Sequence, residues 1–169
     1  TDAFLNLNKS ATYSVDTIEK KPASKSPTAP FTTSTLQQES SRKLYFSVSK
    51  TMNLAQRLYE AGLITYMRTD SVNLSNEAQK EALKQVGKHY GEEYKKPRKY
   101  QVKSKSAQEA HEAIRPTDFS RDKVNLDYDQ SRLYELIWRR AIASQMSDAK
   151  LERTQLKIVT NNHSENFIA

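Results

Sequence analysis

The spacing of apolar residues predicts a mainly helical block in the middle of the chain. In several segments between residues 34 and 146, apolar side chains recur every three or four positions, which is the period of a helix that buries one face. The pattern predicts helices at about 34–46, 49–61, 75–90 and 129–146, and a short helical piece at about 106–114. The last long helix carries a stripe of core candidates, namely Tyr134, Ile137, Trp138, Ala141, Ile142 and Gln145.

Capping residues support the ends of these helices. Ser34 and Gln37 have capping-box spacing at the start of the first helix, and Ser75 is placed to cap the third. Gly62 and Gly91 follow the second and third helices, where glycine readily adopts the left-handed conformation that ends a helix.

The two ends of the chain have strand patterns. Tyr13 and Val15 alternate with polar residues, and residues 1–22 carry no helix signal. Residues 21–30 contain three prolines and no large apolar side chain, so we expect an extended and exposed linker. Residues 151–160 return to strand composition.

A helical block inserted between two β segments predicts an α+β fold that is mainly α. We expect a partly present β domain of residues 1–29 and 149–169, and a helical domain of residues 30–148. The chain starts without Met and stops without a polar tail, so we also expect it to be a piece of a longer protein.

Residues 63–67 form a short β-prone run that leads into a candidate nucleophile. In an extended stretch Tyr66 and Arg68 would project from one face while Met67 points the other way. Only about 0.1% of an ordinary tyrosine is phenolate at pH 7, and a nearby guanidinium favours that form and can hold a phosphate. The pattern fits a phosphoryl-transfer nucleophile with its positioning group. Spacing alone favours the alternative, a packed strand tyrosine beside an exposed arginine.

A second candidate group lies in the predicted helical piece at 106–114. On a helix Gln108, His111 and Arg115 would share one face and offer three phosphate-capable donors. His111 could bind phosphate or relay a proton near neutral pH. A metal site is disfavoured because this segment has a single His and lacks the HExxH spacing. The alternative is a surface helix with ordinary ion pairs.

Composition narrows the function classes. The 169 residues include 27 Lys and Arg against 20 Asp and Glu, a net charge of +7 that favours an anionic partner. The sequence has no Cys, which excludes disulfides, thiolate catalysis and thiol-bound zinc or iron–sulfur clusters. The absence of Cys also fits a cytoplasmic location. No apolar run approaches the length of a membrane span, so we expect no membrane contact.

The excess positive charge is densest in residues 95–105, which hold six basic residues, no acid and an interleaved Tyr100. Such a run can follow a phosphate backbone, although a solvated loop is the alternative. The candidate DNA contacts in it are Lys95, Lys96, Arg98 and Lys99.

Four segments together resemble the bacterial type IA DNA topoisomerases, in the topoisomerase I branch. They are, in order, PFTTSTLQQ from Pro30, AQRLYEAG from Ala55, ITYMRTDS from Ile64 and QEAHEAIRP from Gln108. The TYMRTD string is the most specific, and Met67 is typical of the topoisomerase I branch. The resemblance is close over residues 30–150 and looser in the flanking strands.

The resemblance implies roles for individual residues. Tyr66 would attack a single-strand DNA phosphodiester to give a transient 5′-phosphotyrosyl link and a free 3′-hydroxyl. Arg68 would position the scissile phosphate, and His111 would bond to a DNA phosphate near the site. The remaining implied residues, around the active site or the DNA path, are Gln56, Glu60 and Arg115.

The resemblance also implies what surrounds this piece. The helical domain would be a gate (domain III) carried on an arched β domain (domain II), and the substrate would be single-stranded or negatively supercoiled DNA. The family needs Mg²⁺ held by a TOPRIM domain, whose acidic motif is not in this sequence. We therefore expect no metal site here, partner domains in cis, no relaxation by the isolated chain, and a nucleoid-associated bacterial enzyme.

Two other function classes use the same features. A non-catalytic DNA-binding module would rely on the basic run and on the paired helices at 34–46 and 49–61. A tyrosine recombinase fragment would use the same type of nucleophile but form a 3′-phosphotyrosyl link.

Overall fold

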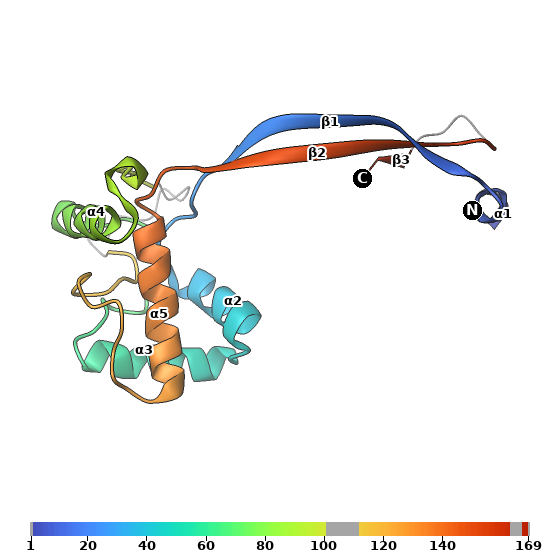
Figure 1. Cartoon of the computed structure of the whole chain (residues 1–169). Coiled ribbons are helices and arrows are strands. Elements are labelled where there is room, and N and C mark those ends of the chain that lie inside the picture. Colours follow the sequence, from blue (N-terminus) through green and yellow to red (C-terminus); the bar gives the residue numbers. More distant parts are fainter. Residues whose placement is uncertain (1, 101–111, 163–166, 169) are drawn as a thin grey trace. The chain divides into compact units, whose positions relative to one another are not determined.

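The computed structural model describes residues 2–100, 112–162 and 167–168. Its helices and strands within these ranges are α1 (Asp2–Lys9), β1 (Tyr13–Lys25), α2 (Thr33–Leu44), α3 (Val48–Glu60), α4 (Asn76–Tyr90), the 3₁₀ helix η1 (Glu92–Tyr94), α5 (Tyr128–Ala143), β2 (Ala149–Thr160) and β3 (Phe167–Ile168) (Figure 1). The fold class is α+β, and the chain divides into two compact units. A β unit comprises Thr1–Lys25 with Asp148–Ala169, and a helical unit comprises Ser26–Ser147.

The β unit is built on a long antiparallel pair, β1 with β2, to which β3 adds a short third strand. The register runs from Tyr13 opposite Thr160 to Lys25 opposite Ala149, with a bulge after Val15. Cross-strand ion pairs, such as Lys20 with Glu152 at 3.1 Å, line the ribbon. Their charges are exposed, so they favour this register without adding much stability.

Two predictions for the first 30 residues are wrong. Residues 2–9 form a helix where we expected none, and its Phe4 ring lies 6.2 Å from the Phe167 ring, a contact that no local pattern reveals. The strand β1 also continues through Pro22 to Lys25 into the predicted linker. A proline is tolerated there because β1 is an edge strand and needs ladder bonds on one side only.

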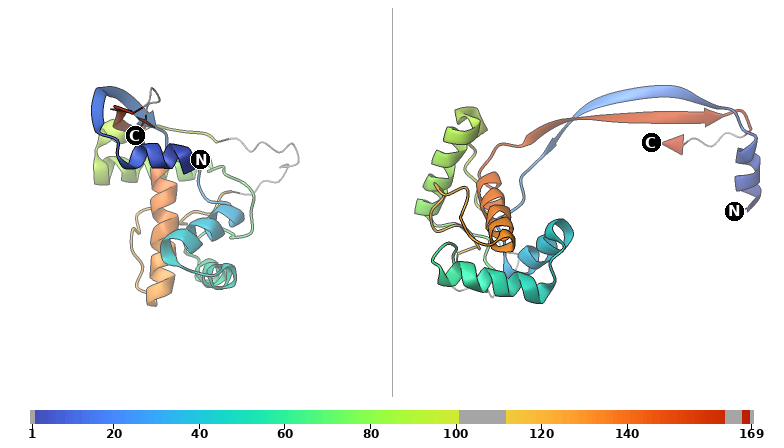
Figure 2. Two further views of the ribbon diagram at one scale, coloured as in Figure 1. Left: turned by 90° about the vertical axis from the view of Figure 1, so that its right-hand side faces the viewer. Right: turned by 60° about the horizontal axis from the view of Figure 1, so that its bottom comes forward.

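The helical unit is organised around α5, which contacts α2, α3 and α4 (Figures 1 and 2). All six residues of the stripe predicted on this helix are buried, although α5 ends at Ala143 rather than at 146. The core that they join has apolar residues from every long helix of the unit, among them Phe31, Leu36, Leu58, Ile64, Met67, Val86, Ile114 and Phe119.

The four long helices are confirmed to within three residues at each end. Ser75 caps α4, and Gly62 follows α3 with the positive φ of 70° that a helix end of this kind requires. The capping box of α2 is formed by Thr32 and Thr35, not by Ser34 and Gln37, so the helix begins at Thr33.

Two short predicted elements are wrong in the described residues. Residues 112–114 are not helical, and Ile114 instead forms a β-bridge with Phe31; residues 106–111 lie outside the described ranges. The run 63–67 forms no strand and has one bridge, between Ile64 and Pro116. In both cases backbone groups pair with a distant segment, which local periodicity does not encode.

Candidate active site around Tyr66

The segment between α3 and α4 alternates between buried and exposed side chains. Met67 is 1% exposed, whereas Tyr66 on one side of it is 42% exposed and Arg68 on the other side is also exposed. Thr69 is buried in turn. Met67 therefore anchors the segment while Tyr66 and Arg68 are open to solvent. Their exposure agrees with the predicted alternation, although the backbone bends at Thr65, Met67 and Arg68 and forms no strand.

The first turn of α2 holds the segment on the side after Tyr66. The hydroxyl of Thr33 donates to the carbonyl of Met67 at 2.8 Å and accepts from the backbone N–H of Thr69 at 2.9 Å. The backbone N–H of Thr33 donates to the carbonyl of Thr69 at 2.9 Å. These bonds fix the backbone on both sides of Arg68.

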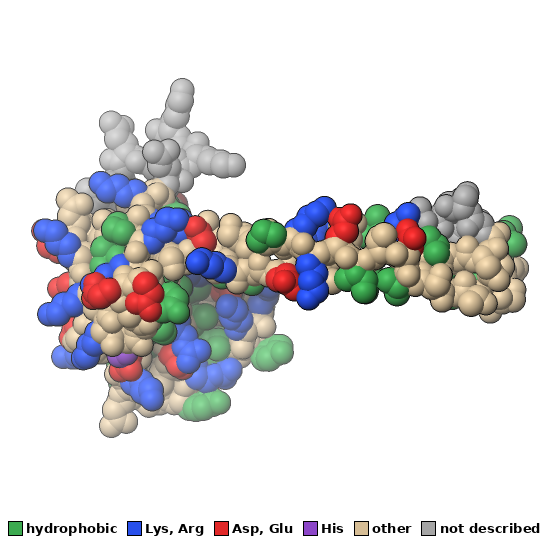
Figure 3. Space-filling model, turned by 45° about the horizontal axis from the view of Figure 1, so that its top comes forward, with side chains coloured by type: hydrophobic (Ala, Val, Ile, Leu, Met, Phe, Trp, Pro, Cys, Tyr) green, Lys and Arg blue, Asp and Glu red, His purple; other side chains and the backbone are tan. Residues whose placement is uncertain are grey.

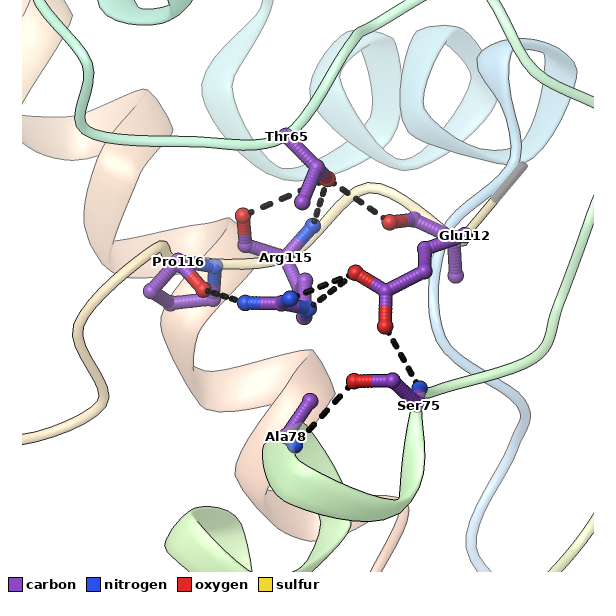
Figure 4. A network of polar contacts seen from close by, with 7 residues as sticks. Thr65, Ser75, Ala78, Glu112, Arg115 and Pro116 are labelled. Atoms are coloured by element: carbon purple, nitrogen blue, oxygen red, sulfur yellow. Dashed lines mark hydrogen bonds and ion pairs between the residues drawn. The ribbon is translucent and has the colours of Figure 1, made fainter. Parts of the chain in front are cut away.

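Residues 113–117 hold the segment on the side before Tyr66 (Figure 4). The Thr65 hydroxyl donates to the carbonyl of Ala113 at 2.7 Å and accepts from the backbone N–H of Arg115 at 3.0 Å. The Thr65 backbone N–H donates to the Arg115 carbonyl at 2.9 Å. The Thr117 hydroxyl also donates to the carbonyl of Gly62 at 2.6 Å. Tyr66 is therefore attached to a backbone that is bonded on both sides.

A partly buried carboxylate connects this region to α4 (Figure 4). Glu112 Oε1 accepts from the backbone N–H of Ser75 at 2.5 Å, and Glu112 Oε2 accepts from Arg115 Nε at 2.9 Å. Burial raises the pKa of Glu112, but its hydrogen bonds from Ser75 and Arg115 outweigh that effect and hold the pKa below its ordinary value. Glu112 is therefore a fixed negative charge near neutral pH.

The end of α3 lies against Tyr66. The ring of Tyr59 meets the Tyr66 ring edge-on, with 5.3 Å between centroids. On the same helix the Gln56 amide donates to the Glu60 carboxylate at 2.7 Å. The predicted residues Gln56 and Glu60 thus lie on α3, the helix whose Tyr59 contacts the candidate nucleophile.

The other predicted residues of this region divide into two cases. His111 lies outside the described residues, so its placement stays a prediction. Arg115 is described, but its side chain is only 14% exposed and is bonded to Glu112 and to the carbonyl of Pro116. The helical face predicted for Gln108, His111 and Arg115 does not extend to Arg115, because residues 112–115 are not helical.

The described part of the basic run is a loop that is anchored near the end of α5 through Arg98. The backbone N–H of Arg98 donates to the side chain of the buried Gln145 at 3.0 Å, and Arg98 Nε donates to the Met146 carbonyl at 3.1 Å. Lys95 forms an ion pair with Glu92 at 2.6 Å. Residues 96–100 are a loop held at Arg98 and Tyr100, while residues 101–105 lie outside the described ranges, so the structure does not decide between a DNA contact and a solvated loop.

Positive charge is not gathered into one large patch on the face drawn in Figure 3, where Lys and Arg side chains alternate with acidic ones. Of the basic run, Lys96 and Lys99 are exposed, and the described residues offer no ion-pair partner to Lys99. Among the described residues of the run, Lys99 is therefore the basic side chain best placed to meet an external anion.

Sequence reasoning missed the threonines that hold the site. Thr33, Thr65 and Thr117 bond to backbone groups between 34 and 55 residues away in the chain. A weak signal existed, because two of the three motif segments that meet here, those from Pro30 and Ile64, are rich in threonine.

The described residues contain no group of three or more His, Asp or Glu side chains arranged to hold a metal ion. No step of the chemistry below is therefore assigned to a metal held by the described residues. None of the described helices is both long and apolar enough to cross a membrane.

Comparison with known proteins identifies the family. The sequence profile of the DNA topoisomerase family matches residues 1–169. DNA topoisomerase 1 of Zymomonas mobilis is 57% identical over 162 residues, which cover 95% of this chain and 13% of that protein. DNA topoisomerase 1 of Mycolicibacterium smegmatis is 53% identical over 157 residues, which cover 89% of this chain and 17% of that protein.

A solved structure agrees with these relatives. The full-length topoisomerase I from Thermotoga maritima matches 100% of this chain with a TM-score of 0.78 and 37% identity, although the match covers only 29% of that chain. The chain thus spans less than a third of the structure and less than a fifth of the two curated relatives. The chain belongs to the bacterial type IA DNA topoisomerase family.

Proposed function

We propose that this chain is the tyrosine-bearing part of a topoisomerase that cuts and reseals one DNA strand, with Tyr66 as the nucleophile. The observation that carries the proposal is the setting of Tyr66, which is 42% exposed on a backbone bonded on both sides. A nucleophile needs access to its substrate and a fixed position, because a small displacement sharply lowers the rate. Family membership supplies the substrate class, DNA.

The proposed step is a transesterification. The Tyr66 oxygen loses its proton and forms a bond to phosphorus, while the bond from phosphorus to the 3′-oxygen breaks and that oxygen gains a proton. The product is a 5′-phosphotyrosyl link and a free 3′-hydroxyl. The reverse step reseals the strand without an external energy source, because one phosphodiester replaces another.

Arg68 is the proposed partner of the scissile phosphate. Its side chain is exposed, and its backbone is held by the bonds from Thr33 to Met67 and Thr69. A guanidinium can donate two parallel hydrogen bonds to a phosphate, and this pairing strengthens as negative charge develops in the transition state.

The remaining parts of the proposal concern other residues and domains. His111, Gln56, Glu60 and the lysines of the basic run would contact DNA near the site, with the helical unit acting as a gate and the β unit as part of an arch. A further domain in cis would hold the Mg²⁺ that the family needs. We propose single-stranded regions of negatively supercoiled DNA as the substrate of the whole enzyme.

The test uses the full-length enzyme that carries this chain. Tyr66→Phe should abolish covalent capture of a single-stranded oligonucleotide under denaturing conditions and leave DNA affinity unchanged. Tyr59→Phe is the matched control, because this neighbouring tyrosine is 41% exposed and touches the Tyr66 ring. Covalent capture by the Tyr66→Phe enzyme would refute the proposal.

End-labelling decides the polarity of the link. In the proposed reaction a label at the 3′ end of the oligonucleotide stays with the protein, and a 5′ label is released. The opposite result would favour the recombinase class. We also expect weak DNA binding and no relaxation from the isolated 169-residue chain, since the proposed metal-binding domain lies elsewhere.

A further inference from the structure

The guanidinium of Arg115 is already occupied within the chain (Figure 4). Nε and Nη2 donate to Glu112 Oε2 at 2.9 and 2.5 Å, and Nη1 donates to the carbonyl of Pro116 at 2.8 Å. The Phe119 ring lies 5.9 Å from the guanidinium carbon. Three of the five N–H donors are used within the chain, and only 14% of the side chain is exposed, so little of the guanidinium is accessible to a DNA phosphate.

The partner carboxylate bridges two parts of the helical unit. While Glu112 Oε2 binds Arg115, Oε1 accepts from the backbone N–H of Ser75, the residue whose hydroxyl caps α4 by accepting from Ala78 N–H at 3.2 Å. Glu112 thereby fixes residues 112–115 against the start of α4.

The backbone of Arg115 is in turn the support of the Tyr66 segment. Its N–H and carbonyl both bond to Thr65, the residue directly before Tyr66, at 3.0 and 2.9 Å. A shift of residues 112–115 would therefore move the backbone next to the candidate nucleophile.

We infer that Glu112 and Arg115 are positioning residues for Tyr66, acting through Thr65, and that Arg115 does not hold a DNA phosphate. The inference rests on the proposed function of Tyr66. A partly buried ion pair suits this role, because such pairs add little net stability but fix one arrangement of the groups they join. The interpretation replaces the DNA contact that the sequence predicts for Arg115.

The experiment compares binding and cleavage by the full-length enzyme on a single-stranded oligonucleotide. Glu112→Gln removes the charge with little change of shape, Arg115→Met removes the guanidinium, and Thr65→Val removes the bridging hydroxyl. Each variant should lower the rate constant of covalent-complex formation at saturating DNA by about tenfold or more, as expected when reacting groups are displaced. DNA affinity should change less than about twofold, because no phosphate contact is lost.

Two further variants separate positioning from general destabilisation. Thr65→Ser keeps the hydroxyl and should retain the wild-type rate constant. Glu135→Gln breaks an ion pair of similar length with Arg139 on the exposed face of α5, at 2.5 Å, and should leave the rate constant unchanged. If a variant only unfolded part of the enzyme, the final yield of covalent complex would fall in proportion to the unfolded fraction, and the rate constant would stay unchanged.

The inference is overturned if Arg115→Met keeps the wild-type rate constant at saturating DNA, whether or not affinity falls. A weaker affinity with a shallower salt dependence would then make Arg115 a phosphate contact. The Tyr66→Phe enzyme separates this failure from that of the proposed function. If that variant captures no DNA while Arg115→Met cleaves at the normal rate, only the positioning role is wrong.

Discussion

Thr33 and Thr69 form a reciprocal pair, in which each backbone N–H donates to the other residue, at 2.9 Å in both directions. One acceptor is the carbonyl of Thr69 and the other is the hydroxyl of Thr33, whose own proton points to the carbonyl of Met67 at 2.8 Å. The pair joins the first turn of α2 to the segment that carries Tyr66, so the helix start and the candidate site depend on each other.

Thr33→Val should destabilise the chain by about 1–3 kcal/mol, because it leaves the N–H of Thr69 without its partner in a partly buried place. Thr33→Ser keeps the hydroxyl and should cost less than about 1 kcal/mol. Urea unfolding of the 169-residue chain measures both changes. Equal stability of the Val and Ser variants would show that the hydroxyl does not hold the segment.

Arg68→Ala should slow covalent-complex formation by about 100-fold at saturating DNA, the size expected when one preorganised donor to a developing anion is lost. Arg68→Lys should recover only part of the rate, because an ammonium group cannot form the two parallel bonds of a guanidinium. Single-turnover cleavage of a labelled oligonucleotide by the full-length enzyme measures the rate constants. A rate within twofold of wild type for Arg68→Ala would exclude the positioning role.

The exposure of Tyr66 and Arg68 could be predicted from the sequence because the alternation of apolar and polar residues is a local property. Met67 is buried between them, although the backbone bends here and forms no strand. The stripe of α5 was predictable for the same reason, since helical periodicity places Ile137 and Ala141 on one face.

The supports of the site could not be predicted in this way. The bonds of Thr65 join residues 48 and 50 positions apart, and no periodic pattern marks which distant segments will meet. The same limit explains the missed helix α1, whose Phe4 contacts Phe167 at the other end of the chain. It also explains the predicted helical face of Gln108, His111 and Arg115, because residues 112–115 form no helix.

Lys99→Gln should make DNA binding less dependent on salt. If its exposed ammonium meets one phosphate of a single strand, the slope of log affinity against log salt should become shallower by about 0.7. Lys95→Gln is the matched control, with a smaller expected change because Lys95 is already paired with Glu92. Titrations of an oligonucleotide at several salt concentrations measure the slope for both variants. A larger change of slope for Lys95→Gln than for Lys99→Gln would contradict the prediction.

Glu112→Gln should change how stability responds to acid. The pKa of Glu112 is held below its ordinary value of 4.5 in the folded chain, so its carboxylate contributes stability that is present above pH 4.5 and lost as pH falls below it. The difference in unfolding free energy between wild type and Glu112→Gln should therefore shrink below pH 4.5. Urea unfolding from pH 3 to 7 measures it, and a difference independent of pH would rule out the charged network.

Tyr134→Phe should act at the opposite end of the pH range. The Tyr134 hydroxyl donates to the carbonyl of Arg121 at 2.7 Å, and burial, followed by the charge of Asp118, raises the pKa of Tyr134 to about 12. Losing this bond should cost about 1–2 kcal/mol near pH 8, since the carbonyl loses its partner.

Above pH 10 the unfolded chain ionises this tyrosine while the folded chain keeps it neutral, so its contribution to stability falls between pH 10 and about pH 12. Tyr134→Phe lacks that loss, and the gap between the two proteins should therefore narrow as pH rises through this window. Unfolding free energies of the wild type and of Tyr134→Phe at pH 8, 10 and 11 measure this difference. The other tyrosines and the lysines titrate alike in both proteins, so their effects largely cancel. A constant gap would mean that Tyr134 titrates normally and that its hydroxyl is not held in the buried bond to Arg121.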